Sequence, residues 1–96
     1  MTAYLIFTRE RTTDQAELDV YGSLAPATAA GHPMTMLARY GPFEVLEGAS
    51  MEGAVVLSFP SMAEAKAYYH SPDYQAAAKH RHAGADYRVL LVEGIA

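Results

Sequence analysis

The sequence predicts an α+β sandwich, in which helices cover one face of an antiparallel sheet. Short runs rich in aliphatic, β-branched and aromatic residues alternate with segments whose apolar residues recur at helical spacing. These elements follow a βαβ order twice, which is the plan of the ferredoxin-like fold. The chain has 96 residues, of which 51% are apolar and 19% charged, so residues 1–96 are expected to form one domain.

The predicted strands are short apolar runs that end at turn residues. They are expected at residues 3–9, 34–40, 43–48, 53–59 and 87–93. Gly41-Pro42 supplies the turn before the additional hairpin strand at 43–48. The first, fourth and last of these runs are apolar on both faces, so both faces of the sheet need a cover. The helices cover one face, and we expect a second copy of the chain to cover the other in a homodimer.

The first helix is expected over residues 14–30, where Leu18 and Tyr21 begin an apolar stripe. Pro26 should kink this helix or end it early, and Gly31 should provide a left-handed exit. The side-chain pairs that match a capping box are Thr12 with Gln15 and Asp14 with Glu17.

A second helical region is expected after the strand at 53–59. Ser61 and Glu64 form a capping box with the correct spacing, and Met62, Ala65 and Tyr69 line one face. Ser71-Pro72 should restart the helix, because serine caps it and proline fits the first helical position. The apolar face of this last segment, which should stop near Gly84, carries Tyr74, Ala77, Ala78 and Arg81.

Composition excludes several classes of partner. Seven basic residues against eleven acidic ones give a net charge of −4, which disfavours nucleic acid and anionic membranes as partners. The long uncharged stretch at 20–38 is interrupted by glycine and proline, so we do not expect it to span a membrane. The chain has no cysteine, which fits a reducing compartment and makes the cytoplasm the expected location.

The histidines do not have the spacing of a metal site. His80 and His82 are two residues apart, which places them on nearly opposite sides of a helix, so neither a metal nor another cofactor is expected. His80 alone remains a candidate acid or base. The chain also has no nucleophile elbow, phosphate loop or dinucleotide fingerprint, which argues against hydrolase, kinase and nicotinamide-dependent dehydrogenase functions.

The candidate ligand-binding residues are two arginines and a glutamate. Arg39 ends an apolar strand beside a turn, where it either clamps a carboxylate or enolate or bridges to Glu44 or Glu47. Glu47 itself is either a ligand-binding carboxylate or a residue of a turn or dimer rim. Arg81 shares a helix face with Tyr74 and has either a binding or a structural role.

Tyr21, Tyr69 and Tyr74 are placed on the inward faces of the helices. They are either core aromatics or, for Tyr21 and Tyr74, neutral proton donors to a bound carbonyl group. The possible catalytic residues are therefore His80, Tyr21 and Tyr74.

The order of several short segments resembles the bacterial domain-of-unknown-function family thirteen-thirty (DUF1330). These segments are ARYG at 38–41, EVLEG at 44–48, FPS at 59–61, YHSPDYQ at 69–75 and LVEG at 91–94. The resemblance implies a ferredoxin-like dimeric α+β barrel, the superfamily of antibiotic-biosynthesis monooxygenases, chlorite-dismutase relatives and muconolactone-isomerase-like enzymes. Arg81 matches an arginine of the family pattern. The chain departs from the pattern at Tyr40-Gly41-Pro42, where relatives often carry two glycines, and at Ser58, where they commonly carry an acidic residue.

Two functional classes are compatible with these features. The first is a cofactor-independent isomerase, cyclase or oxygenase with a small apolar pocket for an anionic or carbonyl-containing ligand. The second is a non-catalytic homodimer that binds a metabolite or has a structural role. An open interior cavity with Arg39 or Arg81 pointing into it would favour the first class, and a sealed interior would favour the second.

Overall fold

The computed structural model describes residues 1–95, which form a sheet of four strands with helices packed against it. The elements in chain order are β1 (Ala3–Thr12), α1 (Gln15–Leu24), the 3-10 helix η1 (Ala25–Ala29), β2 (Thr35–Arg39), β3 (Gly53–Phe59), α2 (Met62–Tyr69), α3 (Pro72–Gly84) and β4 (Ala85–Glu93). Within residues 1–95, no helix is both long enough and apolar enough to cross a membrane.

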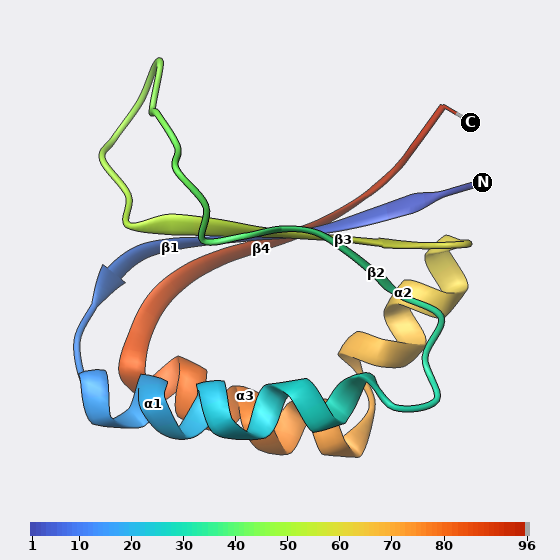
Figure 1. The fold of residues 1–96 in the computed structure, drawn as a ribbon, viewed down its shortest axis with the longest axis horizontal. Helices are drawn as coiled ribbons and strands as arrows, with labels where there is room; N and C mark the ends of the chain where they lie inside the picture. The colour runs from blue at the N-terminus through green and yellow to red at the C-terminus, as the bar shows by residue number, and fades with distance from the viewer. Residues whose placement is uncertain (96) are drawn as a thin grey trace.

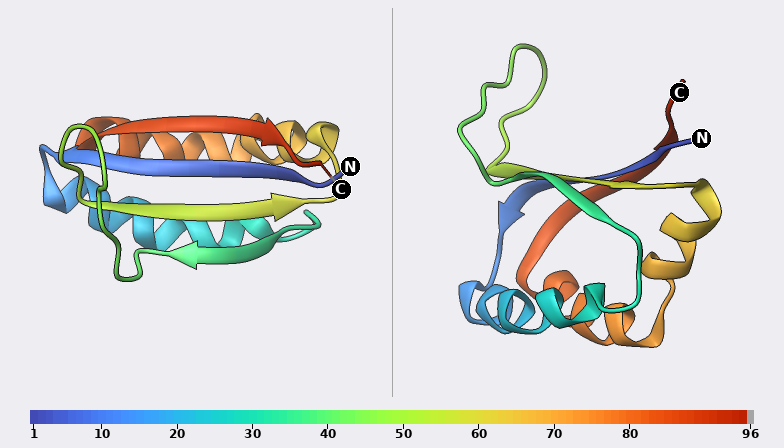
Figure 2. Two further views of the ribbon diagram at one scale, coloured as in Figure 1. Left: turned by 90° about the horizontal axis from the view of Figure 1, so that it is seen from above. Right: turned by 45° about the vertical axis from the view of Figure 1, so that its right-hand side comes forward.

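The sheet is antiparallel throughout, and its strand order is β2-β3-β1-β4. All helices lie on one face of the sheet, with α1 and α3 side by side and α2 leading down from the end of β3 (Figures 1 and 2). This arrangement confirms the predicted ferredoxin-like α+β fold, because two βαβ units place β1 and β3 at the centre of the sheet.

The core lies between the helices and the sheet. Ala3, Leu5 and Phe7 of β1 are buried there, together with Leu57 and Phe59 of β3. Residues between them in sequence point to the opposite face, because successive side chains of a strand alternate. That second face also carries apolar side chains and has no helix over it in residues 1–95 (Figure 1).

The helix ends follow the expected signals closely. Asp14 caps α1, because its carboxylate accepts hydrogen bonds from the amides of Ala16 (3.1 Å) and Glu17 (3.4 Å). Pro26 coincides with the change from α-helix to 3-10 helix, as predicted, and Gly31 adopts a φ of 81°. The second helical region divides into α2 and α3 at Ser71, whose hydroxyl accepts from the amide of Tyr74.

The prediction of a strand at 43–48 is wrong. These residues form an exposed loop that stands away from the sheet on the side opposite the helices (Figures 1 and 2). The chain leaves the plane of the sheet at Tyr40, which has a φ of 51°, and Pro42 has no amide hydrogen to donate to a ladder. The loop returns at Glu52, whose amide donates to the carbonyl of Arg9 at 2.7 Å.

Candidate functional site

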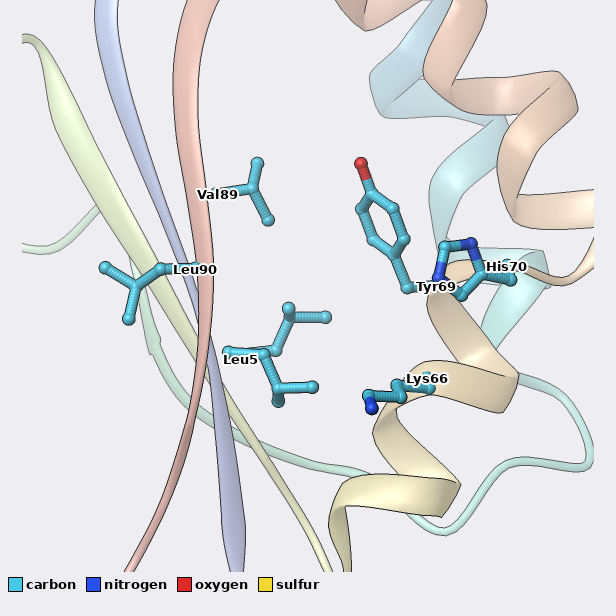
Figure 3. A pocket seen from close by; sticks show the side chains of 7 residues that line it. Leu5, Lys66, Tyr69, His70, Val89 and Leu90 are labelled. Carbon is cyan, nitrogen blue, oxygen red and sulfur yellow. The ribbon is translucent and has the colours of Figure 1, made fainter.

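An apolar pocket opens between α2 and the β4 edge of the sheet (Figure 3). Its volume is about 230 Å³, and its walls and rim are formed by Leu5, Val89, Leu90, Leu91, Lys66, Tyr69 and His70. Leu5 and Val89 extend from the sheet toward the helices, and the ring of Tyr69 lies opposite them with its hydroxyl directed away from Lys66 (Figure 3). Lys66 and His70 are exposed, so the pocket combines apolar walls with a polar rim.

The aromatic cluster behind the pocket contains a buried cation. Tyr69 packs 5.6 Å from the ring of Tyr74, and Tyr74 is completely buried. The guanidinium of Arg81 lies over the rings of Phe7 (5.7 Å) and Tyr87 (5.1 Å), and the residue is 2% exposed. The interior between α3 and the sheet is therefore strongly aromatic, and the Arg81 side chain is buried among its rings.

The Arg81 guanidinium is incompletely paired. Its Nε and Nη2 atoms are buried and find no hydrogen-bond acceptor among residues 1–95. Burial alone would lower the pKa of Arg81, but the oxygens of Tyr74 and Tyr21 outweigh this effect and raise it. Arg81 therefore carries its positive charge in the interior.

The tyrosines beside Arg81 are held in their neutral form. The hydroxyls of Tyr21 on α1 and Tyr74 on α3 are hydrogen-bonded at 2.9 Å. Burial raises the pKa of Tyr21 far above its ordinary value, and the neighbouring Tyr74 raises it further. Burial also raises the pKa of Tyr74, although the charge of Arg81 opposes this shift. Both hydroxyls can donate hydrogen bonds at neutral pH, and neither can act as a base.

Tyr40 and Tyr87 form a second hydrogen-bonded tyrosine pair. Tyr40 reaches over Gly53, where a Cβ atom would come within 2.7 Å of the tyrosine ring, and its hydroxyl bonds to that of Tyr87 at 2.5 Å. The guanidinium of Arg9 lies 4.9 Å from the Tyr40 ring and forms an ion pair of 3.0 Å with Glu52. Burial and the hydrogen bond to Tyr87 raise the pKa of Tyr40. Arg9, unlike Arg81, has its counterion within the chain.

The structure brings only some of the sequence-based candidates together. Tyr21, Tyr74 and Arg81 converge in one cluster, whereas His80 points to α1 and pairs with Glu17 at 2.6 Å. His80 is thus paired with Glu17 and forms no hydrogen bond or ion pair with Tyr21, Tyr74 or Arg81 among residues 1–95.

Arg39 and Glu47 lie elsewhere. Arg39 is exposed on the edge strand β2, three strands from β4, which corresponds to about 14 Å across the sheet. It forms no ion pair with any described residue, neither with Glu44 nor with Glu47. Glu47 is exposed in the loop on the opposite side of the sheet. The ligand-binding roles of Arg39 and Glu47 therefore stay predictions, and the pocket geometry does not support them.

None of the seven residues that line the pocket was among the sequence-based site candidates, although Tyr69 was expected on an inward helix face. A signal was available for β4: residues alternate between the two faces of a strand, so Tyr87, Val89 and Leu91 could have been placed on the helix-facing side with Leu5 and Phe7. Sequence spacing alone could not place His70 at the rim, because that depends on how the break between α2 and α3 is oriented. In residues 1–95, no three histidine, aspartate or glutamate side chains are grouped to hold a metal ion.

Comparison with solved structures identifies the same fold in other proteins. A protein of unknown function from Rhodopseudomonas palustris is 19% identical, with a TM-score of 0.76 over 99% of this chain and 83% of that chain. A dimeric ferredoxin-like protein of unknown function from Thermobifida fusca is 17% identical, with a TM-score of 0.66 over 98% of this chain and 92% of that chain. SnoaB, a cofactor-independent oxygenase from Streptomyces nogalater, is 12% identical, with a TM-score of 0.62 over 97% and 92% of the two chains. At these identities the likeness establishes the fold alone.

A search of curated proteins gave no match. The family model that matches is that of a domain of unknown function, DUF1330, and it covers residues 2–95, almost the whole chain. The match agrees with the segments ARYG, EVLEG and YHSPDYQ noted in the sequence and with the ferredoxin-like topology of the structure. The chain belongs to the DUF1330 family.

Proposed function

We propose that the protein is a homodimeric, cofactor-independent enzyme that moves a proton within a small apolar carbonyl compound bound in the pocket beside α2. The observation that carries this proposal is the pocket itself, which places the imidazole of His70 at the rim of an apolar cavity that Tyr69 also lines. Pockets for drug-sized molecules occupy about 300–1,000 Å³. A volume of about 230 Å³ therefore suits a smaller molecule.

The reaction that these residues support is an isomerisation or cyclisation through an enolate. The imidazole of His70 accepts a proton from the carbon beside the carbonyl group, and the electron pair of the broken C–H bond moves to the carbonyl oxygen. The hydroxyl of Tyr69, the tyrosine that lines the pocket, stabilises that oxygen by donating a hydrogen bond. Return of the proton from His70 to a different carbon gives the isomer, without net oxidation or reduction.

A second candidate function is binding without catalysis. It is favoured by the exposure of His70, whose imidazole is fixed by no hydrogen bond among the described residues. A general base normally needs a defined position near the proton that it removes. Under this alternative, the pocket sequesters or carries the ligand, and Lys66 and His70 only contact it.

Proton exchange distinguishes the two functions. Phenylpyruvate, an apolar keto acid with an acidic methylene group, would be incubated with the protein in heavy water and followed by NMR. The enzyme proposal predicts exchange faster than in the protein-free control, and loss of this acceleration in His70→Gln. His82→Gln, an exposed histidine variant on α3, should behave like the wild type. Binding detected by saturation transfer without accelerated exchange would support the non-catalytic alternative.

A further inference from the structure

Arg81 is a buried cation without a counterion in the described chain. It is 2% exposed, and the ion pairs of residues 1–95 join Arg9 to Glu52, Arg11 to Asp86 and His80 to Glu17. The Tyr21 and Tyr74 hydroxyls are neutral at physiological pH and do not balance its charge. Buried charges in folded proteins are normally paired, because taking an ion out of water costs several kcal/mol.

The two unpaired atoms of Arg81 share one edge of the guanidinium. Nε and Nη2 have no acceptor in residues 1–95, and the N–H bonds on this edge are parallel. Parallel N–H bonds match the two oxygens of a carboxylate, which arginine binds in a bidentate manner. The carbon atom of the same guanidinium lies over the rings of Phe7 and Tyr87, 5.7 Å and 5.1 Å from their centroids.

Arg81 does not line the apolar pocket, but the rings beneath its guanidinium lie next to that pocket along the sheet. Phe7 follows the pocket residue Leu5 by two positions on β1, and Tyr87 precedes the pocket residue Val89 by two positions on the antiparallel β4, so both rings lie on the same face and in the same direction from the pocket. Two residues along a strand correspond to about 7 Å. Tyr69, another pocket residue, contributes to raising the pKa of Arg81. A ligand that extended from the pocket past the ring of Phe7 would therefore bring its far end close to the guanidinium.

We infer that the Nε–Nη2 edge of Arg81 binds an anionic oxygen pair of the ligand, a carboxylate or an equivalent oxyanion, while the apolar part of the ligand fills the pocket. This inference rests on the proposed small-molecule site and deepens it by naming the ligand class, which is a small apolar acid. The anion-binding arginine is then Arg81 on α3 and not Arg39 on β2.

The test uses benzoate as the probe and benzamide, its neutral isostere, as the control ligand, in a buffer without chloride. We expect benzoate, but not benzamide, to raise the melting temperature of the wild type and of Arg39→Met. Arg81→Met should lose this effect, with the dissociation constant for benzoate increased about 10- to 100-fold, which is the usual effect of deleting a charged hydrogen-bonding group. The ligand-free Arg81→Met protein should be as stable as the wild type or more so, because it no longer buries an unpaired charge.

Arg81→Lys is a second variant that keeps the test decisive if Arg81→Met does not fold. Lysine keeps the charge but lacks the parallel N–H edge, so it should fold and bind benzoate more weakly than the wild type. Equal stabilisation by benzamide and benzoate, or an unchanged affinity for benzoate in both Arg81 variants, would overturn the inference. Accelerated exchange of phenylpyruvate in those same variants would leave the proposed reaction standing, so the two proposals fail separately.

Discussion

The pair of hydroxyls at Tyr21 and Tyr74 illustrates what burial does to a titratable residue. Helical periodicity predicted both side chains on inward faces, and the structure confirms this placement. Their separation of 2.9 Å could not be predicted, because it depends on how α1 and α3 pack together. The same limit applies to Arg81: its inward face followed from spacing, but its missing counterion depends on every element around it.

The buried tyrosines predict how the protein unfolds in alkali. Burial raises the pKa values of Tyr21, Tyr40, Tyr68 and Tyr74 above 10.0 in the folded state. Their contribution to stability is therefore complete below about pH 10, the unfolded value, and is lost as the pH rises above it.

We expect the tyrosinate absorbance of these residues to appear together with the loss of the far-ultraviolet circular dichroism signal. Parallel titrations of absorbance and circular dichroism measure this directly. Ionisation of all seven tyrosines of the chain while the dichroism signal remains native would contradict the prediction.

At the level of elements, the contact between α1 and α3 depends on Gly84. A Cβ atom at this position would lie 2.9 Å from the amide nitrogen of Leu18 and 3.0 Å from the carbonyl oxygen of Asp14. The carbonyl of Gly84 also accepts hydrogen bonds from the amides of Thr13 (2.8 Å) and Asp14 (3.0 Å). The end of α3 is thus fixed against the start of α1 by backbone contacts that leave no space for a side chain.

Gly84→Ala is therefore expected to destabilise the protein by about 1–3 kcal/mol, since backbone atoms must move to admit the methyl group. The matched control is Gly22→Ala in α1, where a Cβ atom would meet no described atom within 4 Å. This substitution should stabilise the protein by about 0.5–1 kcal/mol, because alanine favours the helix. Urea unfolding of the two variants measures both changes. Equal changes in stability in the same direction would contradict the prediction, because the close contact at Gly84 would then have no effect of its own on stability.

Element boundaries were predictable where a local signal specifies them. The caps at Asp14, Ser61 and Ser71 and the proline at position 26 all act within a few residues of their own position. The hairpin strand at 43–48 failed because Phe43 and Val45 favour a strand only if another strand or surface is available to pair with them. In the described chain they lie in a loop, where Phe43 is 45% and Val45 39% exposed.

For the whole molecule, the observation of greatest consequence is the sheet face without helices. One row of this face, formed by Leu90, Ile6, Val56 and Ala38, crosses all strands of the sheet from β4 to β2. The loop beside it adds the exposed Leu46, which is 86% accessible. The alternation of apolar residues on both faces was readable in the sequence, and it motivates the homodimer that we propose, with a second copy packed sheet against sheet.

Val56→Asp tests this assembly. Val56 lies near the centre of the open face, so in a dimer each aspartate would be buried without a counterion, and association should weaken by about 100-fold or more. Val20→Asp on α1 is the matched control, because Val20 is 40% exposed on the opposite layer and should leave the dimer intact. Analytical ultracentrifugation gives the mass, and circular dichroism verifies that each variant remains folded.

Leu57→Asp, one residue further along β3 but facing the helices, should instead unfold the chain, because Leu57 is only 4% exposed. A wild-type protein that sediments as a folded monomer at micromolar concentration, or a Val20→Asp variant that dissociates as readily as Val56→Asp, would contradict the dimer, since the open face would then tolerate water.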